Sequence, residues 1–201
     1  MEQNRNIVII SRSNSGKTVM IKNLIYYYIT KYTFHSIILY SKTAKYETEY
    51  NYIDPGNIFD GDLDEMINKI LDWQKDWENK MKLLFIVDDP DLWNKWKKLD
   101  SLFTMGRHFN ITSIIWAQYT KNLIWATVKN NMHYLLFNQV SYTWLETIYD
   151  SVFIKINKRE FFEYIFDIKE QYTFVFYKNG GNIDECFKLC KAKIINYNVK
   201  F

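Results

Sequence analysis

Short, continuous apolar runs recur along this 201-residue chain and alternate with segments of helical periodicity. The runs occupy residues 7–10, 37–40, 83–87, 111–117 and 134–137. Apolar residues without alternation indicate strands that are buried on both faces, as in a parallel sheet. Strands that alternate with helices predict an α/β fold, in which a mostly parallel central sheet is flanked by helices on both sides.

Helical periodicity is clearest in two segments between these runs. Residues 18–31 place apolar side chains at helical spacing, and residues 62–80 begin with Asp62 and Glu65, which resemble a capping box. The apolar stripes consist of Ile21, Leu24, Ile25 and Tyr28 in the first segment and of Leu63, Met66, Ile67, Ile70 and Trp77 in the second. Each stripe predicts a helix that packs one face against the sheet.

The pattern changes after Gln139. It predicts helices around residues 144–149 and 158–166, a strand over 172–177, a turn at 179–182 and a last strand through Phe187 and Leu189. The last two strands flank an Asn-Gly-Gly-Asn turn, so we expect a C-terminal β-hairpin.

The chain has no linker, repeat or low-complexity segment that marks a domain boundary. We therefore expect a single domain over residues 1–201, with a core at about 5–140 and the C-terminal helices and hairpin at about 141–201. No apolar segment is long enough to span a membrane and no cleavage signal is present, which favours a soluble, intracellular protein.

Composition adds little to this picture. The net charge of +3 permits DNA binding without arguing for it, because the pI of about 8.6 lies below the strongly basic range. Cys186 and Cys190 have no histidines at zinc spacing, and we expect reduced thiols. An AT-rich coding sequence explains the many Asn, Lys, Ile and Tyr residues, so we assign the aromatic residues no stacking role.

The first apolar run leads into a sequence that fits a phosphate-binding P-loop. Its residues are Ser11, Arg12, Ser13, Asn14, Ser15, Gly16, Lys17 and Thr18. In such a loop, backbone N–H groups surround an anion, the lysine reaches the β- and γ-phosphates, and the last hydroxyl ligates Mg²⁺. Ser11 replaces the first glycine of the pattern, whereas Asn14 tolerates left-handed backbone geometry. The alternative is a chance match before an ordinary helix.

The apolar run 83–87 ends in Asp88 and Asp89, as a Walker B strand does. We expect Asp88 to hold Mg²⁺ together with Thr18, and Asp89 to act as the general base that polarises the attacking water. Alternatively, these acids only end a strand and cap a helix. Gln118 follows the run 111–117, at the edge where parallel sheets bind ligands, and is expected to read the γ-phosphate.

These elements, together with Gly106-Arg107-His108 and residues 130–133, resemble the poxvirus-type DNA-packaging ATPases of the FtsK/HerA superfamily of P-loop NTPases. The resemblance covers about residues 5–140. It implies a five-stranded core in which the strand before Gln118 lies between the P-loop and Walker B strands. It also implies that the protein binds ATP and Mg²⁺ and hydrolyses ATP to move double-stranded DNA into a preformed capsid.

The resemblance further implies a homo-oligomeric ring, a pentamer or hexamer, at a capsid vertex in the host cytoplasm or at a viral assembly site. An arginine of one protomer then completes the neighbour's site, because a guanidinium stays charged and forks onto phosphate oxygens. Arg107 is the candidate and Arg12 the second choice. Alternatively, Arg107 pairs with an acid of its own subunit. The chain departs from the family in three places: Ser11 in the P-loop, Lys129, where relatives often have arginine, and its short length, with no obvious nuclease domain.

A translocating ring needs cations along its channel, because DNA phosphates supply most of the sequence-independent affinity. Lys95, Lys97 and Lys98 follow the Walker B acids and are the candidates, whereas we interpret Lys42 and Lys45 as a solvated face. Three other functions stay open: a DNA pump for segregation or conjugation, a nucleotide-binding structural subunit with weak turnover, and a small-molecule kinase.

Overall fold

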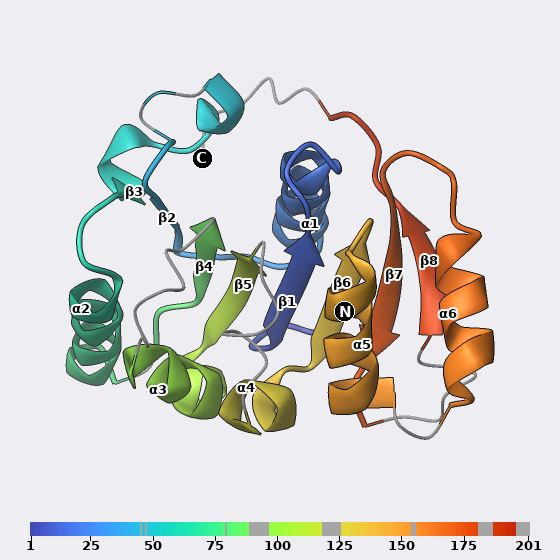
Figure 1. Cartoon of the computed structure of the whole chain (residues 1–201). Helices are drawn as coiled ribbons and strands as arrows, with labels where there is room; N and C mark the ends of the chain where they lie inside the picture. The colour runs from blue at the N-terminus through green and yellow to red at the C-terminus, as the bar shows by residue number, and fades with distance from the viewer. Residues whose placement is uncertain are drawn as a thin grey trace.

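The described residues form an eight-stranded sheet in the order β3-β2-β4-β5-β1-β6-β7-β8 (Figure 1). The structure is a computed structural model, and it describes residues 1–44, 46, 48–78, 80–88, 97–117, 126–153, 156–180 and 187–195, with only the backbone of Lys97. The strands are β1 (Asn6–Ser11), β2 (Ser36–Ser41), β3 (Ile58–Phe59), β4 (Leu83–Asp88), β5 (Ile111–Ala117), β6 (Tyr134–Asn138), β7 (Thr173–Lys178) and β8 (Phe187–Lys191).

The predicted parallel strands are confirmed. Each apolar run lies within one of β1, β2, β4, β5 and β6, which pair in parallel, and β1, β4, β5 and β6 are buried at every position. Along β1, Val8 and Ile10 belong to one hydrophobic layer, whereas Ile7 and Ile9 belong to the other. Burial on both faces is therefore the reason why polar and apolar residues do not alternate in these strands.

Helices cover both faces of the sheet, as predicted, but unequally (Figure 1). One face carries α2 (Leu63–Asp76), α3 (Lys97–Met105), α4 (Ala126–Asn131), α5 (Tyr142–Ile148) and α6 (Lys158–Phe166). The other carries α1 (Lys17–Lys31) and the short helix η1 (Thr48–Tyr50). Further short helices are η2 (Pro55–Asn57), η3 (Gly106–Phe109) and the π-helical η4 (Tyr149–Phe153). The N-terminus of α1 thus lies over the face that only one long helix covers.

The helix predicted over residues 62–80 is shorter than expected. Asp62 caps it as predicted, since its carboxylate accepts a hydrogen bond from the Glu65 N–H at 2.7 Å. The assignment of Trp77 to the apolar stripe is wrong, because α2 ends at Asp76 and the Trp77 side chain is 61% exposed. Glu78, with φ of 50°, has the left-handed conformation that commonly ends a helix.

The predicted C-terminal hairpin is confirmed. β7 pairs antiparallel with β6 and with β8, so these last strands extend the parallel sheet at one edge. Residues 181–186, which include Cys186, lie outside the described residues. Cys190 in β8 is a free thiol, and burial raises the pKa of this thiol above its ordinary value. None of the helices that the structure describes has the length and apolar character needed to cross a bilayer.

Candidate nucleotide-binding site

The P-loop and the Walker B strand meet at the carboxyl edge of the sheet. β5 lies between β1 and β4, as the resemblance implied, and all three strands end at this edge (Figure 1). Lys17 is the first residue of α1, and its Nζ lies 3.0 Å from Oδ1 of Asp88. The Asp88 side chain is only 2% exposed and that of Lys17 is 20% exposed. Two motifs that are far apart in the sequence therefore form one polar site.

The P-loop backbone has the conformation that its residue types predict. Asn14 has φ of 61° and Gly16 has φ of 89°, both in the left-handed region. The Ser15 hydroxyl donates a hydrogen bond to the Arg12 carbonyl at 2.6 Å and closes the loop. A Cβ atom at Gly16 would overlap the Tyr172 ring, so both the φ angle and the available space require glycine.

Ser11 does not disturb this geometry. It is the last residue of β1, pairs in register with Asn138 of β6, and is not among the described residues with positive φ. Its buried hydroxyl accepts a hydrogen bond from the indole N–H of Trp116 at 2.8 Å. At the position of the first P-loop glycine, this chain therefore has an ordinary extended backbone, which a serine adopts without strain.

Asp88 is held from two sides. The Tyr50 hydroxyl donates a hydrogen bond to Oδ2 at 2.7 Å. Oδ1 has the Lys17 ammonium nearby but no hydrogen-bond partner with suitable geometry among the described residues. A buried carboxylate oxygen of this kind is suited to accept a hydrogen bond from the water shell of Mg²⁺, the role predicted for Asp88.

A metal ion at this site would need the nucleotide as well as the protein. In the part of the chain that the structure describes, no group of three His, Cys, Asp or Glu residues could hold one. Thr18, the second residue of α1, and Asp88 fit the Mg²⁺ of a phosphate complex, in which phosphate oxygens and water supply the remaining ligands.

Four residues near these elements have no role in the sequence analysis: Tyr50, Trp116, Asn138 and Tyr172. The Asn138 amide donates a hydrogen bond to the Ser15 carbonyl at 2.9 Å, while its Oδ1 is buried and has no hydrogen-bond partner within the described residues. The Trp116 ring centre lies 3.7 Å from Lys17 Nζ. The place of Asn138 directly after a buried apolar run is the same signal that marked Asp88. The aromatic residues carried no comparable signal.

Several predicted site residues lie outside the described residues. These are Asp89, Gln118 and Lys95, together with the side chain of Lys97. Asp89 and Gln118 directly follow Asp88 and Ala117, the last residues of β4 and β5. Lys98 is the second residue of α3, where its backbone N–H donates a hydrogen bond to Asp64 Oδ1 at 3.1 Å. Their roles stay predictions.

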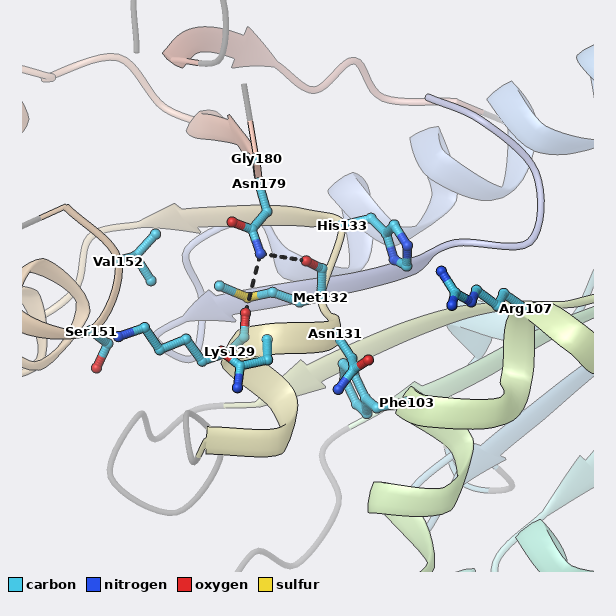
Figure 2. A pocket seen from close by; sticks show the side chains of 11 residues that line it. Phe103, Arg107, Lys129, Asn131, Met132, His133, Ser151, Val152, Asn179 and Gly180 are labelled. Carbon is cyan, nitrogen blue, oxygen red and sulfur yellow. Dashed lines mark hydrogen bonds between the residues drawn. The ribbon is translucent and has the colours of Figure 1, made fainter. Parts of the chain in front are cut away.

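Arg107 lies in η3 at the opposite, amino edge of the sheet. It lines a cavity of about 470 Å³, and its guanidinium points toward the His133 imidazole (Figure 2). Burial, followed by the charges of Arg5 and Arg107, lowers the pKa of His133. Within the described part of the chain, Arg107 has no carboxylate partner, and its contact is with His108 at 3.3 Å. The structure thus gives no support to an ion pair with an acid of its own subunit.

Lys129, the residue that departs from the family pattern, lines the same cavity. The Asn179 amide donates hydrogen bonds to the carbonyls of Lys129, at 3.1 Å, and Met132, at 2.9 Å, and so ties the end of β7 to α4 (Figure 2). Asn6 supports the same edge, because its amide donates to the carbonyls of Phe103 and Asn131. The cavity is therefore built on hydrogen-bonded backbone.

Comparisons with known proteins agree with this geometry. The family model described as Poxvirus A32 protein matches residues 1–175. The genome packaging NTPase B204 from Sulfolobus turreted icosahedral virus 2, in complex with AMPPCP, has a similar structure, with a TM-score of 0.69, 17% identity, and coverage of 95% of this chain and 99% of that chain. The crystal structure of B204, the DNA-packaging ATPase from Sulfolobus Turreted Icosahedral Virus, has a TM-score of 0.66 and 18% identity, with coverage of 96% of this chain and 100% of that chain.

The likeness extends to a conjugation protein. The pCW3 conjugation coupling protein TcpA has a TM-score of 0.60 and 13% identity, with coverage of 94% of this chain and 60% of that chain. At these identities the likeness shows the fold, that of a P-loop NTPase. No curated protein matches the chain by sequence.

The bond between Tyr50 and Asp88 can be tested directly. We expect Tyr50→Phe to lower the free energy of unfolding by about 1–3 kcal/mol, because it removes a donor from a buried carboxylate oxygen. Tyr46→Phe is the matched control, since the Tyr46 side chain is 89% exposed, and it should change this free energy by less than about 0.5 kcal/mol. Urea unfolding measures the free energy of unfolding of both variants. If the curve of Tyr50→Phe equals that of the wild type, the hydrogen bond contributes nothing to stability.

Proposed function

This chain belongs to the Poxvirus A32 protein family, and we propose that it is a ring-forming ATPase that drives double-stranded DNA into a preformed viral capsid. The observation that carries the proposal is the 3.0 Å contact between Lys17 and Asp88, which joins a P-loop to a Walker B strand at the ligand-binding edge of the sheet. The likeness to B204, a viral genome packaging NTPase, over nearly the full length of both chains supports it.

The site residues have separate roles in this reaction. Backbone N–H groups of residues 11–18 surround the triphosphate, and Lys17 binds its β- and γ-phosphates. Thr18 and Asp88 hold Mg²⁺, which neutralises charge on the phosphates. Asp89 takes the proton of the attacking water, and Gln118 reads the presence of the γ-phosphate.

Arg107 acts on the nucleotide of the neighbouring subunit. β5 is seven residues long and separates η3 from the carboxyl edge by about 20 Å, so Arg107 is too far from its own P-loop to contact phosphate. Head-to-tail interfaces close into a ring and bring different surfaces of the two subunits together. Such an interface can place the amino edge of one protomer against the P-loop edge of the next. Arg12, exposed within the P-loop, is the second choice.

Contact with DNA is assigned to Lys95, Lys97 and Lys98. These lysines follow the Walker B acids in the chain, so a change at the γ-phosphate can alter their position. The ring, a pentamer or hexamer, then couples turnover to movement of the DNA backbone at the capsid vertex, in the host cytoplasm or at a viral assembly site.

A DNA pump for conjugation is the second candidate, because TcpA has the same fold. It is less favoured, since this chain spans 60% of that protein, whereas it spans nearly all of B204. A nucleotide-binding structural subunit with weak turnover is a further candidate, because Ser11 departs from the P-loop pattern. It is less favoured, since the Ser11 backbone stays extended at the end of β1.

Asp89→Asn tests the proposed chemistry. We expect the variant to bind ATP with unchanged affinity and to hydrolyse it about 10²–10⁴-fold more slowly, because an amide cannot accept the proton of the attacking water. Phosphate release, measured with and without double-stranded DNA, reports turnover. Asp91→Asn, in the same segment, is the control for loss of charge and should retain turnover. Full activity of Asp89→Asn would remove Asp89 from the mechanism.

Mixed rings test whether Arg107 acts between subunits. Arg107→Ala should lower turnover about a thousandfold or more, because the transition-state charge loses its guanidinium. When Arg107→Ala and Asp89→Asn protomers are mixed, some interfaces pair an intact Asp89 with an intact Arg107, so activity should partly return. Arg159→Ala, which removes an exposed arginine of α6, is the control and should retain turnover. Mixtures without any recovery would place Arg107 outside a shared site.

Charge reversal of Lys95, Lys97 and Lys98 to glutamate tests the DNA contact. We expect the triple variant to lose the stimulation of ATP turnover by DNA, because three phosphate contacts become repulsive. Turnover without DNA should stay, since these lysines do not bind the nucleotide. Undiminished stimulation would contradict the assignment.

A further inference from the structure

We propose that Trp116 positions the P-loop lysine, and that Ser11 replaces the first P-loop glycine because its hydroxyl fixes the Trp116 ring. The inference rests on the proposed nucleotide-binding function. It adds Trp116, which belongs to no nucleotide-binding motif, and gives the Ser11 side chain a role that the P-loop motif does not assign. Trp116 and Ser11 are positioning residues, since both act on the nucleotide through Lys17.

The contact between Lys17 and Trp116 has the geometry of a cation–π interaction. Lys17 Nζ lies 3.7 Å from the Trp116 ring centre, well within the range of about 6 Å over which a ring face attracts an ammonium group. The Trp116 side chain is 1% exposed, so the interaction is largely shielded from water. Asp88 Oδ1 lies 3.0 Å from the same ammonium group. The ring and the carboxylate together confine the end of a flexible four-carbon side chain.

The indole is itself held in one orientation. Trp116 pairs in register with Ile9 of β1, within the hydrophobic layer that α1 covers. Its N–H donates a hydrogen bond to the Ser11 hydroxyl at 2.8 Å. Because a buried indole N–H without an acceptor is costly, this bond selects the orientation in which the ring face lies beneath Lys17.

This arrangement explains the departure at position 11. A glycine there has no side chain, so it would leave the Trp116 N–H without this acceptor. The serine backbone stays in the strand conformation, as its place in β1 shows. Restoring the more common glycine should therefore weaken nucleotide binding in this chain, the opposite of what the motif alone predicts.

Equilibrium binding of a nonhydrolysable ATP analogue and of AMP tests the proposal. Trp116→Leu removes the ring face, and we expect the Kd of the ATP analogue to rise about tenfold. Trp116→Phe retains a ring and should stay within about threefold of the wild type. The Kd of AMP should change little, because AMP lacks the phosphates that Lys17 reaches. A purely structural role of Trp116 would lower stability but leave the Kd of the folded protein unchanged, or would raise both Kd values alike.

Ser11→Gly provides the second arm. Alone, it should raise the Kd of the ATP analogue several-fold, whereas in the Trp116→Phe background it should add little, because that ring has no N–H to satisfy. Phe161→Leu, a buried aromatic substitution in α6 and in the layer on the other face of the sheet, is the control and should leave both Kd values unchanged.

The outcomes separate this proposal from the proposed function. If the wild-type protein binds no ATP analogue, the proposed function fails. If it binds and folded Trp116→Leu or Ser11→Gly binds equally well, only the positioning role is wrong.

Discussion

The buried carboxylate of Asp88 is the constraint on which the site depends. A charged group almost without solvent contact is stable only with partners, and removing one partner of a buried pair typically costs about 3–5 kcal/mol. Lys17 and Tyr50 are those partners. They come from the start of α1 and from η1, so the carboxylate requires both elements to meet the end of β4. The same electrostatic demand that stabilises the fold therefore brings a lysine and an acid together at the proposed nucleotide-binding site.

The parallel sheet gives the molecule two chemically different edges. At the carboxyl edge the P-loop, Asp88 and Asn138 lie close together, because parallel strands β4, β1 and β6 all end there. At the amino edge, Arg107 and Lys129 line a cavity. A protomer with its nucleotide loop at one end and an arginine without a described carboxylate partner at the other is suited to head-to-tail assembly, in which each interface has both parts.

Aromatic residues contribute more to the site than composition suggested. The abundance of tyrosine has a sufficient explanation in coding bias, yet Trp116 lies beneath Lys17, Tyr50 binds Asp88, and Tyr172 packs against Gly16. Trp116 and Tyr50 combine a large apolar surface with a ring face, N–H or hydroxyl that binds a polar group, whereas the Tyr172 ring fills the space beside Gly16. Abundance of a residue type therefore says little about the role of any one residue of that type.

The sequence by itself determined the parallel strands, the limits of α1 and α6, and the P-loop and Walker B motifs. Burial on both faces, helical spacing and phosphate chemistry are properties of local residue order. The sequence analysis overestimated the length of α2. The left-handed backbone at Glu78, which follows the end of this helix, has no signature in the apolar periodicity. Only the tertiary structure decided that Trp116, Tyr50, Asn138 and Tyr172 surround the P-loop and Asp88. The hydrogen bonds of Tyr50, Trp116 and Asn138 join residues 38, 105 and 123 positions apart in the chain. Strand order and register, which no local pattern encodes, bring these residues together.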